Sequence, residues 1–276
     1  MNKNKPIAIF DSGIGSYSIV RVLRKTLPNE NIVYLADQVS FPYGTKKHIE
    51  LKNNILLRIK LLEKKYNPKL IIVASNTPSI QVLDEIKPLA DTKLLGVYPP
   101  VERAVKITKS KSIGILATKG AVESPEIDEF IKKKRLPKNI RFIKINASDL
   151  VALVESGMFQ QDKHTTKDVI KKLLDHIIRL NPNIDVMTLS STHLPFLKDY
   201  FIRIYPKITF LDPADDVSQQ IKILLKKNNL LNNTNNKGKL SIITTVDKNR
   251  DLTVDGLKRI LLKLGLRTEV LAVNII

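Results

Sequence analysis

The sequence predicts an α/β protein with two doubly wound parallel-sheet domains that face each other across a central cleft. Short apolar runs rich in Ile, Leu and Val alternate with longer amphipathic segments, which is typical of parallel strands covered by helices on both faces. Polar clusters follow the ends of these runs, and two of them are alike. Ala74–Thr77 and Ser190–His193 each follow an apolar run and lead into a helical pattern, so we expect two related half-sites.

The chain opens with a strand at Ile7–Phe10, a glycine-containing turn and a helix from about Ser18 to Leu27. The other strands are expected where apolar runs end in turn-forming or polar residues. They are Asn31–Ala36, Leu70–Ala74, Leu94–Val97, Ser112–Ala117, Ile140–Ile145, Val186–Leu189, Thr209–Leu211, Leu240–Thr245 and Thr268–Ala272.

Helices are expected between these strands wherever apolar residues recur at helical spacing. They end near Tyr66, Ile86 and Lys227, begin near Leu150 and Pro195, span Pro125–Lys134 and Thr166–Leu180, and include one between the last two strands. The segments Thr118–Gly120 and Asn228–Lys239 read as loops, the second because it is rich in Asn, Lys and Gly.

Composition excludes several kinds of chemistry. The 276 residues contain no cysteine, which removes disulfides, thiolate metal sites and thiol catalysis together. Four histidines are scattered without ligand spacing, so we expect no zinc site. No stretch reaches the apolar length of a transmembrane helix, and the polar start lacks a signal-peptide core. We therefore expect a cytoplasmic protein without membrane partners.

The net charge is +19, from 46 basic and 27 acidic residues. Such a surface can attract nucleic acid, anionic lipid or acidic metabolites. The lysines are dispersed, however, and no aromatic residues interleave with them to stack on bases. We interpret the charge as solvated helix faces and do not expect nucleic-acid binding, which would in any case fall steeply with salt.

Polar residues gather where strands end, which is where open α/β sheets bind their ligands. They are Asp11-Ser12, Asp37, Ser75-Asn76-Thr77, Thr118 and Ser191-Thr192-His193. Each serine cluster taken singly could be an ordinary helix N-cap. A nucleotide site is disfavoured because the third fingerprint glycine after Gly13 and Gly15 is missing. A Ser/His hydrolase is disfavoured because Ser191 and His193 are too close in sequence and the nucleophile-elbow motif is absent.

These segments resemble motifs of the cofactor-independent amino-acid racemases, and most closely those of the glutamate racemase family. Ile9–Gly15 resembles the opening F-D-S-G-V-G-G, and Asp37 with Phe41–Gly44 resembles G-D-x-x-x-x-P-Y-G. Val73–Thr77 is similar to A-C-N-T and Leu189–Pro195 to L-G-C-T-H-Y-P, with serine at both cysteine positions. Ile113–Thr118 and Leu150–Gly157 match two further segments, so the resemblance runs from about Ile7 to Asp212.

The resemblance implies two α/β domains with the active site between them and the end of the chain returning to the first domain. On that basis we expect one domain at residues 1–97 plus 208–276 and a second at residues 98–207. The implied activity interconverts L- and D-glutamate by two-base proton transfer at the α-carbon and supplies D-glutamate for peptidoglycan, and so for cell shape. It needs neither pyridoxal phosphate nor a metal, and family members often form dimers. The charge pattern does not separate glutamate from aspartate as substrate.

The resemblance also implies roles for individual residues at the positions that match the family motifs. The implied acid/base positions are Ser75 and Ser191, and Asp37 and Glu155 would orient or tune them, together with His193. The residues that would hold the substrate are Asp11, Ser12, Tyr43, Gly44, Asn76, Thr77, Thr118, Thr192 and His193.

The two serines depart from the family pattern in a way that bears on catalysis. A thiol with a pKa near 8.5 is readily poised near neutrality, whereas an aliphatic hydroxyl is a far weaker acid. Further departures are Ser16, Ala147 and Leu194. Three interpretations remain open: an active racemase, a homologue that binds an acidic amino acid without racemising it, and serine chemistry by another route.

Overall fold

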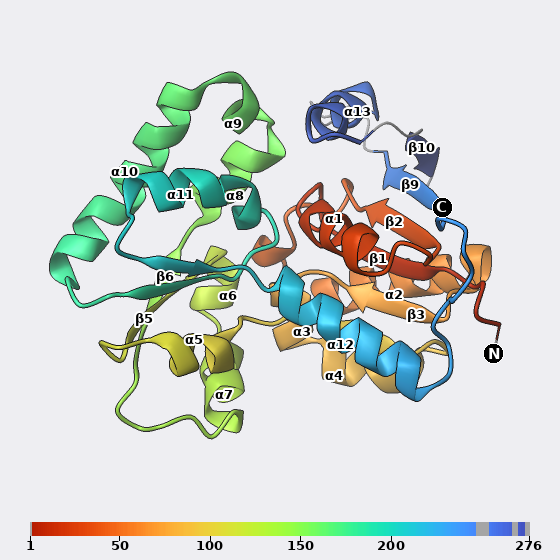
Figure 1. The fold of residues 1–276 in the computed structure, drawn as a ribbon, viewed down its shortest axis with the longest axis horizontal. Helices are drawn as coiled ribbons and strands as arrows, with labels where there is room; N and C mark the ends of the chain where they lie inside the picture. Colours follow the sequence, from red (N-terminus) through yellow and green to blue (C-terminus); the bar gives the residue numbers. More distant parts are fainter. Residues whose placement is uncertain (1, 247–253, 267–269, 274–276) are drawn as a thin grey trace. The chain divides into compact units, whose positions relative to one another are not determined.

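The computed structural model describes residues 2–246, 254–266 and 270–273. The chain forms two compact units, Met1–Val97 with Ala214–Ile276 and Tyr98–Pro213. Within the described residues, the first unit contains a six-stranded sheet and the second a four-stranded sheet, and every pair of neighbouring strands is parallel (Figure 1). The expected α/β class with two parallel sheets is confirmed.

The sheet of the first unit has the order β10-β9-β2-β1-β3-β4. Its strands are β1 (Ile7–Asp11), β2 (Ile32–Ala36), β3 (Leu70–Val73), β4 (Leu94–Gly96), β9 (Leu240–Thr245) and β10 (Val270–Val273). All residues of β1, β2 and β3 are buried, as expected for strands with helices on both faces. Asp11 pairs with Ala36, and Phe10 pairs with Val73, so these three strands end at the same edge.

The helices of the first unit divide between the two faces of this sheet. They are α1 (Tyr17–Thr26), η1 (Tyr43–Thr45), α2 (His48–Tyr66), α3 (Asn76–Gln81), α4 (Leu83–Ile86), η2 (Lys87–Leu89), α12 (Ala214–Lys227) and α13 (Val254–Lys263). From β1 the chain moves to β2 and then back past β1 to β3, so right-handed crossovers place α1 and α2 on opposite faces. Helix α1 packs against α12, and α2 packs against α3 and α4 (Figure 1).

The sheet of the second unit has the order β6-β5-β7-β8, with strands β5 (Ser112–Ala117), β6 (Arg141–Asn146), β7 (Val186–Leu189) and β8 (Thr209–Leu211). Its helices are α5 (Val101–Ile107), α6 (Lys119–Val122), α7 (Pro125–Lys133), α8 (Ser148–Glu155), α9 (Met158–Gln161), α10 (Lys163–Leu180), η3 (Leu194–Leu197) and α11 (Lys198–Ile204). Part of its core consists of Ala104, Ile113, Val186 and Leu211, which come from one helix and three strands.

Several local expectations were wrong in detail. Helix α5 follows Pro99-Pro100 and was not predicted, because seven residues give too short a pattern to detect. The segment Thr118–Gly120, expected as a loop, begins the one-turn helix α6. Strand β8 pairs with β7, and both lie in the second unit, which runs from Tyr98 to Pro213. The expected strand Thr268–Ala272 lies partly outside the described residues.

A buried ion pair lies at the end of the first sheet opposite the polar clusters. Lys69 Nζ contacts Glu30 Oε2 and also donates to the carbonyls of Lys3 and Leu230, at 2.6 and 2.9 Å. Glu30 Oε1 accepts from the backbone N–H of Asn232 at 2.8 Å. Burial lowers the pKa of Lys69, and the attraction of Glu30 opposes that shift. This cluster ties the 228–239 loop to the sheet.

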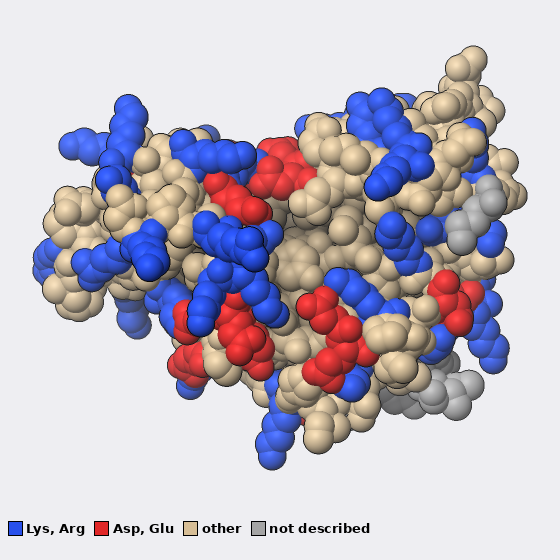
Figure 2. Space-filling model, turned by 90° about the horizontal axis from the view of Figure 1, so that it is seen from below, with Lys and Arg blue, Asp and Glu red and all other residues tan. Residues whose placement is uncertain are grey.

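Basic side chains are spread over the face of the molecule in Figure 2, with acidic side chains between them. Some of the lysines belong to local surface ion pairs, such as Lys52 with Glu85 and Lys144 with Asp128. Across the part of the chain that the structure describes, no helix combines the length and apolarity needed to cross a membrane.

Candidate functional site

Polar side chains line the carboxyl ends of four adjacent strands in the first sheet. We call this set the first polar edge; its members are Asp11, Ser12, Asp37, Ser75, Asn76 and Thr245. They follow or end β1, β2, β3 and β9, which are neighbours in the order β9-β2-β1-β3. The backbone N–H of Asp37 donates to the carbonyl of Asp11 at 2.8 Å, so the ladder continues to the edge itself.

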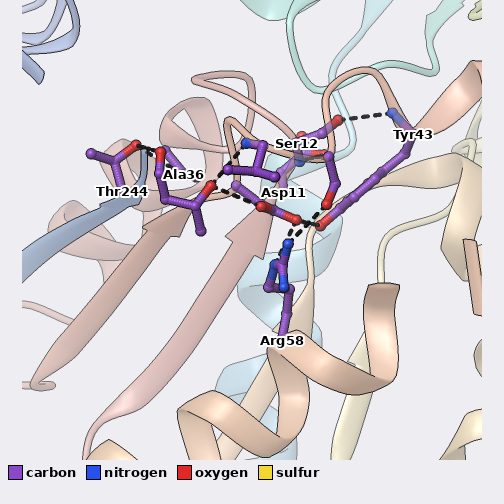
Figure 3. Close-up of polar contacts among 10 residues, drawn as sticks. Asp11, Ser12, Ala36, Tyr43, Arg58 and Thr244 are labelled. Atoms are coloured by element: carbon purple, nitrogen blue, oxygen red, sulfur yellow. Dashed lines mark hydrogen bonds and ion pairs between the residues drawn. The ribbon is translucent and has the colours of Figure 1, made fainter. Parts of the chain in front are cut away.

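Asp37 is fully buried and is held from three sides. Its Oδ1 accepts from Thr245 Oγ1 at 2.9 Å, and its Oδ2 accepts from Tyr43 OH at 2.9 Å. Oδ2 also lies 2.8 Å from Nε of Arg58, which rises from α2 below the edge (Figure 3). A carboxylate with these partners acts as an acceptor only.

Tyr43 connects this network to the first strand's turn. Burial raises the pKa of Tyr43 well above its ordinary value, and the negative charge of Asp37 raises it further, so the phenol stays protonated. Its backbone N–H donates to Ser12 Oγ at 3.3 Å, while the N–H of Ser12 donates to Asp11 Oδ1 at 2.7 Å (Figure 3). Gly44 follows Tyr43 in the same 3₁₀ turn.

Ser75 and Asn76 stand at the start of α3, after β3. Ser75 occupies the N-cap position but makes no capping hydrogen bond with its side chain, so the N-cap interpretation fails for its hydroxyl. Asn76 is only 3% exposed, and neither Oδ1 nor Nδ2 of its amide has a partner among the described residues. Thr77 follows in the same helix and is also buried. An unpaired amide at this depth is costly unless a ligand or water completes it.

The second unit has a corresponding set, which we call the second polar edge: Thr118, Ser190, Ser191, Thr192, His193 and Glu155. Strands β5 and β7 are neighbours, and the N–H of Ser190 donates to the carbonyl of Leu116 at 2.8 Å. Thr118 is the N-cap residue of α6 and is half-buried. Ser191, Thr192 and His193 are all buried in the turn that leads from β7 into η3.

His193 and Glu155 form a buried contact within this second edge. Nε2 of the imidazole lies 2.8 Å from Oε2 of Glu155, and both side chains are nearly inaccessible. Glu155 ends α8 and His193 precedes η3, so the contact joins two separate elements. The hydroxyl of Ser191, two residues before His193, has no hydrogen-bond partner in the described part of the chain, and the same is true of Ser75.

The structure thus brings Asp11, Ser12, Asp37 and Tyr43 into one network and His193 and Glu155 into another. Sequence reasoning missed Arg58 and Thr245, which complete the contacts of Asp37. The sequence did contain a feature that could have identified Arg58. It lies on the buried stripe of α2 with Leu51, Ile55, Ile59 and Leu62, where a charged residue needs a buried partner.

Comparisons with known proteins agree with this architecture. The glutamate racemase of Actinobacillus pleuropneumoniae serotype 7 is 31% identical over 246 residues, covering 88% of this chain and 89% of the relative. The glutamate racemase of Francisella tularensis, solved in complex with D-glutamate, is 26% identical with a TM-score of 0.81, covering 98% of both chains.

The fold is also that of a Bacillus anthracis glutamate racemase, with a TM-score of 0.84 at 21% identity and coverage of 99% of this chain and 98% of the other. No protein-family model matches the chain. The level of identity and its extent over nearly the whole length decide the assignment: this chain belongs to the glutamate racemase family.

Proposed function

We propose that the protein binds glutamate through its first polar edge and that serine at positions 75 and 191 leaves it without effective racemase chemistry. The Francisella tularensis relative was solved with D-glutamate, which supports an acidic amino acid as the ligand. The strongly positive net charge favours the approach of such an anion.

The observation that carries this proposal is the buried amide of Asn76. Its Oδ1 needs a donor and its Nδ2 needs an acceptor, and no described residue supplies either. An amino acid offers both, since its ammonium donates and its carboxylates accept. Leaving such a buried group unpaired costs about 1–3 kcal/mol, so a ligand that satisfies it gains affinity.

Ser12 offers a second contact of defined polarity. Its oxygen accepts from the N–H of Tyr43, which uses one of its two acceptor sites, and its hydroxyl proton can still donate to a ligand. Because β1 and β3 are neighbouring strands, this hydroxyl and the amide of Asn76 follow adjacent strand ends, and a donor there suits a carboxylate group of the ligand. The first polar edge therefore supplies the hydrogen bonds that a dicarboxylic amino acid requires.

The chemistry of the two serines argues against efficient turnover. Removing an α-proton calls for a group whose pKa lies near the working pH, and a hydroxyl does not meet that requirement without a strong adjacent base. No described residue hydrogen-bonds the hydroxyl of Ser75 or Ser191, so neither is activated in this way. The loss of well-matched general acid–base groups costs about 10²–10⁴-fold in rate.

A second candidate function is racemisation itself, which would supply D-glutamate for peptidoglycan. The contact between His193 and Glu155 favours it, because a buried acid–base pair two residues from Ser191 is what a proton-transfer site needs. The two candidates share the ligand and differ only in whether the α-proton exchanges.

Calorimetric titration with L- and D-glutamate tests the binding proposal. We expect saturable binding by the unmodified protein and a loss of about tenfold or more in Asn76→Leu, because the apolar side chain fills the volume without the two hydrogen bonds. Asn53→Leu, at an exposed position of α2, is the matched control and should bind like the unmodified protein. Absence of glutamate binding would refute the function, and unchanged affinity in Asn76→Leu would refute the role of the amide.

A further inference from the structure

Arg58 is a buried cation that the family motifs do not include. It lies in the middle of α2 and is 2% exposed, on the stripe that packs against the sheet. A buried guanidinium keeps its charge and requires an anion and acceptors close by. The partners it finds are Asp37, with Nε to Oδ2 at 2.8 Å, and Ser40, whose Oγ accepts from Nη2 at 2.9 Å.

This pairing fixes what Asp37 can do. Arg58, Tyr43 and Thr245 all present a donor to Asp37, so the two oxygens of this side chain are held by groups from three different elements. Asp37 therefore acts on the first polar edge through Tyr43 and Thr245, the two residues whose hydroxyls donate to its carboxylate.

The route from Arg58 to the ligand-binding hydroxyl runs through Tyr43. The phenol of Tyr43 donates to Asp37, and the backbone N–H of Tyr43 donates to Ser12 Oγ. Ser40, which Arg58 also holds, precedes the same turn. Figure 3 shows Arg58 and Tyr43 converging below the Asp11–Ser12 turn. If this turn moved, Ser12 Oγ would lose the hydrogen bond from the N–H of Tyr43. The hydroxyl proton of Ser12 would then no longer be held in one direction.

We infer that Arg58 is a positioning residue for ligand binding: by anchoring Asp37 and Ser40 it fixes the Tyr43 turn, which orients the Ser12 hydroxyl as a donor toward a ligand carboxylate. This inference rests on the proposed function for the identity of the ligand. The chain of contacts itself is independent of that function and can be measured without a ligand.

The test compares Arg58→Met, Arg58→Lys and the double variant Arg58→Met/Asp37→Asn. We expect Arg58→Met to bind glutamate about tenfold more weakly or worse, because Asp37 is left as an uncompensated buried charge and the turn shifts. Arg58→Lys keeps the charge but cannot span both Asp37 and Ser40, so its affinity should lie in between. The double variant removes the unpaired charge but also lacks the contacts to Asp37 and Ser40, so its affinity should exceed that of Arg58→Met and stay below that of the unmodified protein.

A second readout separates this inference from the proposed function. In hydrogen exchange without ligand, the amide of Tyr43 should exchange faster in Arg58→Met, and in the double variant its rate should fall only part of the way back. Lys60→Met, on the same helix but paired at the surface, should change neither readout. Unchanged Tyr43 exchange, or unchanged affinity in folded Arg58→Met, overturns the role of Arg58. If the protein binds no glutamate but shows this exchange pattern, the contacts of Arg58 still position the Tyr43 turn, and only the proposed ligand is wrong.

Discussion

The double variant Ser75→Cys/Ser191→Cys is expected to exchange the α-proton of glutamate about 10²–10⁴-fold faster than the unmodified protein. Each substitution replaces a hydroxyl by a thiol whose ordinary pKa, near 8.5, can be lowered to the working range by its surroundings. The flanking motifs and the His193–Glu155 contact are already in place. Loss of the α-proton signal of L-glutamate in deuterated water, with circular dichroism to detect D-glutamate, measures the gain.

The two single variants show whether one thiol is enough for exchange of the α-proton. A racemase needs a proton-transfer group on each side of the α-carbon, so Ser75→Cys and Ser191→Cys alone should fall well short of the pair. Ser110→Cys places a thiol at an exposed site away from both polar edges and controls for nonspecific thiol chemistry. If the double variant were folded, bound glutamate and exchanged no faster than the unmodified protein, the serines would not be what limits the chemistry.

Lys69→Met is expected to lower the free energy of unfolding by about 3–5 kcal/mol. The substitution leaves Glu30 as a buried carboxylate without its cation and also removes the donor to the carbonyls of Lys3 and Leu230. Urea denaturation followed by circular dichroism measures the change, provided that the slope with denaturant stays constant.

The double variant Lys69→Met/Glu30→Gln is the matched control for that prediction. It removes both charges, and the Gln side chain keeps an oxygen that can accept from the N–H of Asn232. It should therefore be clearly more stable than Lys69→Met alone, while Lys65→Met at an exposed position should change stability little. A Lys69→Met protein as stable as the unmodified one would show that the burial of this pair is not maintained in solution.

The fold was predictable because its signals are local. Apolar runs such as Ile7–Phe10 and Leu70–Ala74 mark buried parallel strands, and residues that follow such runs necessarily gather at one edge of the sheet. This is why Asp11, Asp37 and Ser75 could be assigned to a site before any coordinates were known. The break between α3 and α4 at Val82 was not predictable, since the apolar spacing continues across it.

The networks behind the polar edges could not be derived in the same way. Asp37 was recognised, but its partners Arg58 and Thr245 come from a helix and a strand that are distant in sequence. The same holds for Lys69 with Glu30. Which buried cation meets which carboxylate depends on helix packing against the sheet, and sequence spacing carries no information on that.

The central claim, that the protein binds glutamate without effective exchange at the α-carbon, is tested most directly with the unmodified chain. The measurement is the proton NMR signal of the α-hydrogen of L-glutamate in deuterated water, at protein and ligand concentrations for which calorimetry shows saturation. The account predicts that this signal persists over a period in which the Ser75→Cys/Ser191→Cys variant removes it. Loss of the signal with the unmodified protein at a rate similar to that variant's would contradict it.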